Sequence, residues 1–245
     1  RQRVEHVRRI GVVFGQRTQL WWDLPTIESF ELLRHVYRIP LARWRANLDA
    51  FTGLLELGPF LDTPVRQLSL GQRMRADLAA ALLHDPAILF LDEPTIGLDV
   101  VARERIRQFL RQINRERGVT VILTTHDLGD VERLCRRVIL IDHGHVIYDG
   151  DLEALRERFG RWRTLVVDLA ATPDGATAIE APGAEVARAE GPRVWLRFDR
   201  RATTAAALIA AVAARYPVRD LTVEEPEIEA IVRDIYQSGS AGGER

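Results

Sequence analysis

Short runs of apolar, mostly β-branched residues alternate along the chain with longer stretches in which apolar residues recur every three or four positions. The first pattern predicts buried strands, and the second predicts amphipathic helices. Their alternation is typical of a parallel sheet covered by helices, so the sequence predicts an α/β fold. The predicted strands of this part are Ile10–Phe14, Ala87–Leu91, Val119–Thr124, Arg137–Ile141 and a hairpin partner, His145–Tyr148.

The stretch between the first two predicted strands, Pro25–His84, is almost purely helical in its pattern. One of its helices would place five large side chains on a single face. These are Leu41, Trp44, Leu48, Phe51 and Leu55. A further helix is predicted over Leu98–Arg117, with Gly118 as its C-terminal stop.

The composition changes near Phe159–Arg163, which predicts a domain boundary at about residue 160. Residues 161–237 are predicted to form a small α+β domain, and residues 238–245, rich in Gly and Ser, a disordered tail. Its predicted strands are Thr164–Leu169, Glu185–Ala189, Val194–Phe198 and Val218–Val223, and its predicted helices are Thr203–Arg215 and Glu227–Tyr236.

Composition and charge exclude several classes of function. The 245 residues carry a formal net charge of -1, which gives no overall field for attracting DNA, RNA or an anionic membrane. No apolar run approaches the ~18 residues that would span a bilayer. One cysteine forms no disulfide framework, so a cytosolic location is expected. The sequence contains no lysine, so any mechanism that needs a lysine ammonium is excluded within it.

Two adjacent carboxylates, Asp92 and Glu93, follow a buried strand at its carboxyl end, where ligands bind in open α/β sheets. Pro94 predicts that Glu93 is extended, so that the two side chains diverge. One carboxylate could then hold Mg²⁺ through water, and the other could orient or deprotonate an attacking water. Taken alone, the pair is more often a strand that runs into a polar loop.

A second candidate site lies at Ser69 and Gly71, where a loop enters a helix. A helix N-terminus with a hydroxyl and a close-approach glycine can bind an anion, although an ordinary serine N-cap explains the pattern equally well. His126 and Gln16 each follow a predicted strand and could contact a phosphate or a metal. A lone histidine or glutamine at such a place is more often structural.

The order of these segments resembles the nucleotide-binding subunit of ABC transporters. LSLGQ at Leu68–Gln72 resembles the signature motif of that family, LFLDEP at Leu89–Pro94 its Walker B motif, and TTHD at Thr124–Asp127 its switch histidine. IGLD at Ile96–Asp99 resembles the D-loop. The segment Gly15–Leu33 is similar to subunits of drug-type exporters. The resemblance covers about residues 9–150 and implies a P-loop NTPase-like core with a helical subdomain at about residues 25–84.

The resemblance implies a dimeric motor that binds ATP and Mg²⁺ between two head-to-tail subunits. Within one site, Asp92 and Gln16 would serve the metal, while Glu93, His126 and Gln16 would serve catalysis. The residues implied to reach the nucleotide of the partner subunit, or the seam beside it, are Ser69, Gly71, Gln72 and Asp99. Such a division suits phosphoryl transfer, which depends chiefly on positioning and charge stabilisation.

The sequence departs from the family pattern in two respects. It contains no Gly-rich phosphate loop with a lysine, and it begins with Arg1 rather than Met, so we expect that the ATPase core lacks its N-terminal part. The chain alone is then expected to bind ATP weakly and to be inactive, since charge-assisted hydrogen bonds contribute about 1.5–3 kcal/mol each. In addition, Leu70 replaces a usual glycine of the signature, a change that we expect to be tolerated.

The function implied by the resemblance is ATP hydrolysis that powers substrate export. The expected partners are a second ATPase subunit, identical or not, and a transmembrane permease, at the cytoplasmic face of the membrane; nucleic acid is not expected. The alternative is a non-transport ABC ATPase in DNA maintenance or translation. Too few residues separate Gln16 from Ser69 for the coiled-coil arm of the DNA enzymes, and translation-associated members commonly carry two nucleotide domains.

Two adjacent tryptophans, Trp21 and Trp22, leave two interpretations open. They follow Gln16, where the family docks its membrane partner, so they could form an interface; burial within the helical region is equally compatible with the sequence. Stacking on nucleic-acid bases is less favoured, because no basic stripe accompanies them.

Overall fold

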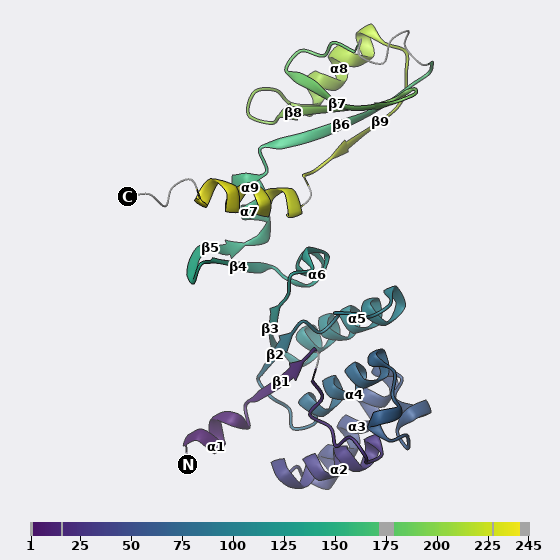
Figure 1. Cartoon of the computed structure of the whole chain (residues 1–245), viewed down its shortest axis with the longest axis vertical. Helices are drawn as coiled ribbons and strands as arrows, with labels where there is room; N and C mark the ends of the chain where they lie inside the picture. The colour runs from purple at the N-terminus through teal and green to yellow at the C-terminus, as the bar shows by residue number, and fades with distance from the viewer. Residues whose placement is uncertain (1, 16, 172–178, 227, 241–245) are drawn as a thin grey trace. The chain divides into compact units, whose positions relative to one another are not determined.

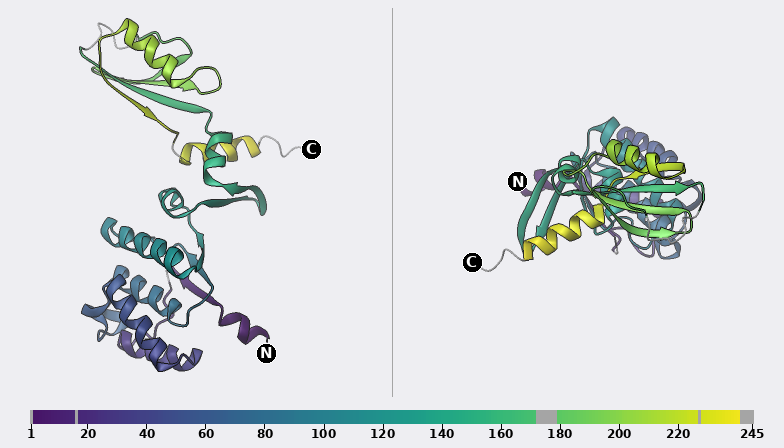
Figure 2. Two further views of the ribbon diagram at one scale, coloured as in Figure 1. Left: turned by 180° about the vertical axis from the view of Figure 1, so that it is seen from behind. Right: turned by 90° about the horizontal axis from the view of Figure 1, so that it is seen from above.

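A computed structural model describes residues 2–15, 17–171, 179–226 and 228–240 of the chain (Figures 1 and 2). The chain divides into two compact units, an N-terminal unit, Arg1–Leu134, and a C-terminal unit, Cys135–Arg245. This division lies about 25 residues before the domain boundary predicted near residue 160, because the hairpin after residue 135 belongs to the second unit. The domain boundary itself stays a prediction.

A three-stranded parallel sheet forms the centre of the N-terminal unit. Its strands are β1 (Ile10–Phe14), β2 (Ile88–Asp92) and β3 (Thr120–Thr124), in the order β1-β2-β3. Phe14, Asp92 and Thr124 are in register at the last pairs of the ladder. All three strands therefore end at the same edge, called here the carboxyl edge.

Helices make up most of the rest of the N-terminal unit. They are α1 (Gln2–Val7), α2 (Thr26–Tyr37), α3 (Leu41–Leu55), η1 (Gly58–Phe60), η2 (Val65–Gln67), α4 (Leu70–Leu82), α5 (Val100–Arg117) and α6 (Leu128–Leu134). The predicted helical region is confirmed as α2, α3 and α4. Helix α5 begins after its N-cap, Asp99, and ends at Gly118, whose φ of 65° is the left-handed conformation that a C-terminal glycine adopts.

Only one face of the parallel sheet is covered by these helices. In Figures 1 and 2, α2 to α5 lie on one side of the three strands, and Val13, Leu89 and Leu91 on that side are buried in the core. Side chains on the opposite face alternate with them along each strand. Three of these, Phe14, Phe90 and Ile122, are 52%, 38% and 42% exposed. We call this surface, together with Val12, the open face.

The C-terminal unit begins with a hairpin and continues into an α+β sandwich. The hairpin is β4 (Arg137–Asp142) and β5 (His145–Asp151), followed by α7 (Leu152–Phe159). The four-stranded antiparallel sheet has the order β7-β8-β6-β9, and Figure 2 shows α8 along one face of it. Its elements are β6 (Trp162–Leu169), β7 (Ala184–Glu190), β8 (Arg193–Asp199), α8 (Ala205–Arg215) and β9 (Val218–Glu224). The four predicted strands and the predicted helix Thr203–Arg215 are thus confirmed, with bounds shifted by one or two residues.

The last described element is α9 (Ile228–Ser240), which contacts α7. Residues 238–240, predicted to be disordered, continue this helix because its buried residues, including Ile231 and Ile235, anchor the preceding turns. Residues 241–245 lie outside the described part of the chain. Among the described helices, none combines the length and the apolar character needed to cross a membrane.

Candidate functional site

The first group of predicted site residues lies at the carboxyl edge of the parallel sheet. Asp92, the last residue of β2, is exposed. The Thr124 hydroxyl on β3 donates a hydrogen bond to Asp92 Oδ1 over 2.7 Å, and Gly15 N–H donates to the Asp92 carbonyl over 2.7 Å. The Asp92 carboxylate is therefore oriented at the edge where open α/β sheets bind ligands.

The backbone turns sharply at Glu93, directly after β2. Its φ of 50° lies in the left-handed region, so the extended conformation predicted from Pro94 is wrong. Glu93 N–H donates to the Thr124 carbonyl over 2.9 Å, which holds the turn against β3. A Cβ at Gly15 would lie 2.2 Å from the Glu93 carbonyl oxygen, so only glycine fits beside this turn. The two carboxylates have different partners, Thr124 for Asp92 and His126 with Thr125 for Glu93.

The Glu93 carboxylate is held against His126 and Thr125. Its Oε1 lies 2.7 Å from His126 Nδ1 and accepts a hydrogen bond from His126 N–H over 3.1 Å. The Thr125 hydroxyl donates to Oε2 over 3.3 Å. The hydrogen bond and the negative charge of Glu93 raise the pKa of His126. The histidine side chain is 75% exposed, so its Nε2 edge is accessible from solvent.

A buried clamp, absent from the sequence predictions, holds the loops that carry these residues. Asp130 on α6 is fully buried and accepts hydrogen bonds from Thr95, which follows Pro94, and from Arg107 on α5. The Arg107 Nε–Asp130 Oδ1 distance is 2.6 Å. Because a buried charge is stable only when it is paired, the clamp fixes the loop after Glu93 relative to the helix after His126.

The second group of predicted residues lies at the start of α4. Ser69 is the N-cap, and its hydroxyl oxygen accepts from Gln72 N–H over 3.2 Å. Gln72 Oε1 in turn accepts from Ser69 N–H over 2.8 Å. This capping box is the ordinary structural role that the sequence left open. It fixes both side chains at the helix end, where backbone N–H groups carry partial positive charge.

A surface cavity of about 500 Å³ joins this helix end to the start of α5. Ser69, Gly71, Gln72 and Asp99 all line it. Asp99 caps α5 by accepting from Ala102 N–H over 2.8 Å. Leu70, the residue that departs from the family pattern, is half-buried beside Gly97, whose φ is 70°. The substitution thus packs against the D-loop segment and leaves Gly71 at the helix entry.

The predicted site residues therefore form two groups within the N-terminal unit. Asp92, Glu93 and His126 meet at the carboxyl edge, whereas the four others surround the cavity at the start of α4. Among the described residues, no hydrogen bond or ion pair joins one group to the other. Gln16 lies outside the described residues.

The donor groups at the carboxyl edge fit a magnesium ion better than a closed metal centre. Asp92 offers a carboxylate beside the Thr124 hydroxyl, and Mg²⁺ prefers one or two carboxylates together with waters and substrate phosphates. In the described part of the chain, no group of three or more His, Cys, Asp or Glu side chains could hold a metal ion.

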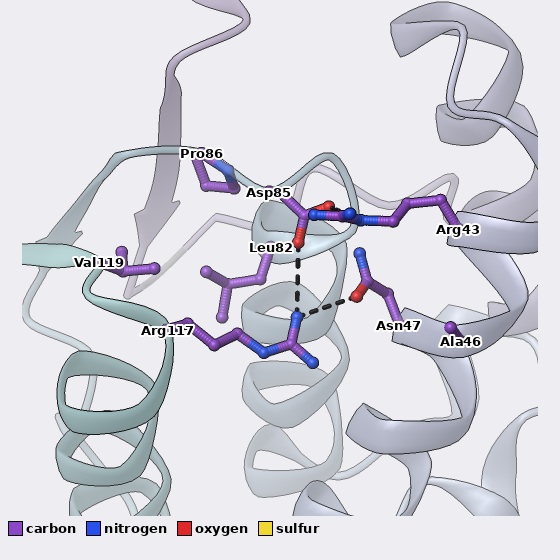
Figure 3. A pocket seen from close by; sticks show the side chains of 8 residues that line it. All are labelled: Arg43, Ala46, Asn47, Leu82, Asp85, Pro86, Arg117 and Val119. Carbon is purple, nitrogen blue, oxygen red and sulfur yellow. Dashed lines mark hydrogen bonds and ion pairs between the residues drawn. The ribbon is translucent and has the colours of Figure 1, made fainter.

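The cavity drawn in Figure 3, about 490 Å³ in volume, lies away from these residues. Its lining includes Pro86 and Val119, which directly precede β2 and β3, so it lies at the opposite edge of the sheet. Asp85 accepts from Arg43 over 2.6 Å and from Arg117 over 3.4 Å, as Figure 3 shows for Arg117. These contacts connect α3 and α5 with the loop that follows α4, so they hold these elements together.

Parts of this chain match a family model and several curated proteins. Residues 45–129 match a family model described as "AAA domain, putative AbiEii toxin, Type IV TA system". The ABC transporter ATP-binding protein NatA of Bacillus subtilis is 34% identical over 157 residues, which are 64% of this chain and 63% of NatA. The molybdenum import ATP-binding protein ModC of Bordetella pertussis is 32% identical over 203 residues, 82% of this chain and 54% of ModC.

Among solved structures, the chain is similar to a dimeric post-hydrolysis state of the ATP-binding cassette MJ0796 bound to ADP and Pi. The identity is 32% and the TM-score 0.54, over 61% of this chain and 66% of that one. The chain spans 63% and 54% of the lengths of the two curated relatives. Both kinds of comparison thus point to the same type of domain.

Proposed function

Because this chain is an ABC-type ATP-binding protein in sequence and fold, we propose that the whole protein hydrolyses ATP to drive transport through a separate membrane-spanning partner. The observation that carries the proposal is the meeting of Asp92, Glu93 and His126 at the carboxyl edge of the sheet. A metal-binding carboxylate, a second carboxylate and an imidazole at one edge supply the groups that phosphoryl transfer to water requires.

Each residue of this group has a distinct task in the proposal. Asp92 would hold Mg²⁺ through water, and the bound ion would neutralise charge on the phosphates. Glu93 orients the attacking water and accepts its proton. His126, whose pKa is raised by Glu93, donates from its exposed Nε2 edge to the terminal phosphate. Gln16 is proposed, on family resemblance, to contact the metal and the attacking water.

The cavity at the start of α4 is proposed to receive the nucleotide of a second subunit. Ser69, Gly71 and Gln72 would contact its phosphates, and Asp99 would lie at the seam between subunits. The accessible helix N-terminus beside the 500 Å³ cavity supports this assignment. Arg in place of Ser69 should fill the cavity and stop ATP turnover, and unchanged turnover in Ser69→Arg would contradict it.

The open face of the sheet supports the proposal that the rest of the whole protein completes the site. Parallel sheets are covered on both faces, yet Phe14, Phe90 and Ile122 are exposed here. We propose that a segment outside these 245 residues covers them and supplies the phosphate loop. The chain alone should then bind ATP weakly and hydrolyse none. Calorimetric titration with ATP tests this, and micromolar affinity would contradict it.

The membrane partner is proposed to dock near Trp21 and Trp22. Their exposure, 42% and 50%, excludes the burial that the sequence left open. We propose a location at the cytoplasmic face of the membrane. We also propose transport in the export direction, which rests on the resemblance of Gly15–Leu33 to exporter subunits. Import is the alternative, because the chain is also similar to the importer subunit ModC. Co-purification of the whole protein with a neighbour-encoded membrane protein supports transport, whereas ribosomes or DNA in its place favour the non-transport alternative.

The decisive experiment is Glu93→Gln in the whole protein. We expect ATP binding within twofold of wild type and turnover lowered by about 10²- to 10⁴-fold, the contribution of a positioned general base. Glu132→Gln makes the same chemical change on the exposed side of α6 and should leave turnover unchanged. Near-normal turnover of Glu93→Gln would remove Glu93 from its proposed role.

A further inference from the structure

The segment that follows β1 is attached to two different parts of the N-terminal unit. At its start, Gly15 N–H donates to the carbonyl of Asp92 over 2.7 Å. Further along, the Thr18 hydroxyl donates to Asp77 Oδ1 over 2.9 Å, and Gln19 N–H donates to the same oxygen over 3.1 Å. Asp77 belongs to α4. The segment thus connects the strand end that carries the carboxylates with the helix that begins at Ser69.

The second attachment involves side-chain and backbone groups of both partners. Gln19 Nε2 donates to the backbone carbonyl of Asp77 over 3.2 Å, and Leu20 N–H donates to the Thr18 hydroxyl over 3.1 Å. Two consecutive residues of the segment are therefore fixed on one residue of the helix. Several hydrogen bonds to one carboxylate oxygen and to the backbone carbonyl of the same residue fix both the orientation of the segment and its distance from the helix.

Asp77 is an unusual residue for its place on the helix. It is 4% exposed, and its α4 neighbours Met74, Leu78 and Ala81 belong to the hydrophobic core. Burial raises the pKa of Asp77 to about 6, while the hydrogen bonds from Thr18 and Gln19 and the charge of Arg73 act against that rise. A buried carboxylate costs free energy that an apolar residue would not. Packing therefore gives no reason for an acid here, whereas the attachment of the segment does.

We propose that Asp77 is a positioning residue, which fixes the segment after β1 to α4 and so holds the carboxyl edge and the Ser69 helix end in one geometry. The inference rests on the proposed function. Helix α4 is a rigid rod, and Asp77 lies about 12 Å along it from the N-cap at ~1.5 Å per residue. Movement of the segment is consequently transmitted to the helix end that borders the cavity.

The proposed role makes a specific demand on the kinetics. Loosening the attachment leaves the groups that bind ATP in place but lets the carboxylates and the partner-facing helix end move independently. An interaction needed only in the transition state lowers kcat and leaves KM unchanged. A defect of folding alone would instead reduce the amount of active enzyme, without changing its pH profile.

The test uses the whole protein with four substitutions. Asp77→Leu removes the acceptor and keeps the number and branching of the side-chain heavy atoms, and Thr18→Val removes one donor. Asp77→Asn keeps an acceptor oxygen, and Leu78→Ala opens the core next to Asp77 without touching the segment. We expect kcat to fall at least tenfold in Asp77→Leu and several-fold in Thr18→Val, with KM for ATP within twofold of wild type in both.

The other variants separate positioning from folding. Asp77→Asn should restore kcat to within threefold of wild type, and Leu78→Ala should lower the melting temperature but not the kcat of the folded enzyme. The double variant Asp77→Leu/Thr18→Val should be no slower than Asp77→Leu alone, since both remove one attachment. Equal kcat for Asp77→Leu and wild type, or equal losses in Asp77→Leu and Leu78→Ala, would overturn the proposal.

The pH profile and amide hydrogen exchange give readouts that differ from turnover. Arg17 and Tyr37 line the same 220 Å³ cavity as Asp77, and Arg73 is the cation on α4 that interacts with it. Titration of Asp77 should appear near pH 6 in the kcat profile of wild type and disappear in Asp77→Asn.

Hydrogen exchange of the 245-residue chain keeps this inference separate from the proposed function. Protection of the Gln19 amide should fall at least tenfold in Asp77→Leu and persist in Asp77→Asn. Unchanged protection in Asp77→Leu would overturn the attachment even if the protein hydrolyses ATP. If protection is lost in Asp77→Leu but the wild-type protein has no ATPase activity, the inference about the attachment stands and the proposed function is refuted.

Discussion

The two sheets of this protein differ in the side chains on the face that no helix covers. Each has one face packed against helices. The other face of the N-terminal sheet presents Phe90 and Ile122 to the surroundings, whereas that of the C-terminal sheet carries cross-strand polar pairs. There Arg193 donates to Asp168 over 2.8 Å, and Trp195 lies between Arg188 and Arg193. Antiparallel sheets tolerate one solvated face; parallel sheets are normally covered on both.

The same contrast applies to the way in which the two units hold their charges. In the N-terminal unit, Arg107 and Asp130 are 9% and 0% exposed at the side chain. In the C-terminal unit, Arg193 and Asp168 are 53% and 27% exposed. Exposed pairs contribute about 0–1 kcal/mol, while an unpaired buried charge is costly. The N-terminal unit thus contains a buried ion pair and a sheet face with exposed apolar side chains, whereas the C-terminal sheet has exposed ion pairs on its second face.

The strongest way to break this contrast is to remove one acid from each unit. Asp130→Ala leaves the buried Arg107 with only its 3.8 Å contact to Glu104, so we expect the N-terminal unit to lose up to about 3–5 kcal/mol of unfolding free energy. Asp168→Ala, the matched change on the C-terminal sheet, should cost about 0–1 kcal/mol. Urea unfolding followed by circular dichroism measures both. Equal costs would show that burial does not distinguish the two pairs.

The open face can be tested by comparing the chain with the whole protein. Phe90→Ala should cost about 1–2 kcal/mol in the 245-residue chain, because the residue is already 38% exposed. In the whole protein, where we propose that the face is covered, the cost should reach about 3 kcal/mol. Phe198→Ala, at a position 1% exposed in the C-terminal unit, should cost about 3 kcal/mol in both. A Phe90→Ala cost that is the same in the two proteins would contradict the cover.

The periodicity of the sequence predicted most of both sheets, because strand burial is a local signal. Ile10–Phe14 was predicted with its final bounds, and the strands of the C-terminal unit within three residues at either end. The short helices α1, α6 and α7 were missed, since six to eight residues give too few turns for a helical pattern. Which face of the parallel sheet is covered could not be predicted, because both faces are apolar in the sequence.

The candidate site was predictable where it follows strand ends and unpredictable where it depends on tertiary contacts. Asp92, Glu93 and His126 were found because they directly follow predicted strands, and the structure brings them together. The left-handed turn at Glu93 lies against Gly15, which is distant in sequence, so the local pattern around Pro94 did not reveal it. Neither the periodicity nor the motifs of the sequence pointed to Asp77 or Asp130. A buried acid on a helix differs from an exposed one only through its tertiary contacts.

The buried carboxylate of Asp77 should make the stability of the N-terminal unit depend on pH. Its folded pKa, about 6, lies above the ordinary value of 3.8, so folding favours the protonated form. That advantage is complete below about pH 4 and is lost as the pH rises through 6. Asp77→Asn cannot ionise, so above pH 7 it should be more stable than wild type, by about 1–3 kcal/mol, with no difference near pH 4. Unfolding at the two pH values measures this; a constant difference would contradict the buried ionisation.

The smallest expected effect concerns the exposed pair of Glu93 and His126. Glu93 raises the pKa of His126, so the pair stabilises the fold most below the unfolded pKa, and this contribution is lost as the pH rises through the raised value. Glu93→Gln removes the charge, and the pKa of His126 should then fall toward the ordinary 6.5. NMR titration of the imidazole protons measures it directly. An identical His126 pKa in wild type and Glu93→Gln would mean that the 2.7 Å contact between Glu93 and His126 is not maintained in solution. His126 would then not hold the Glu93 carboxylate in place.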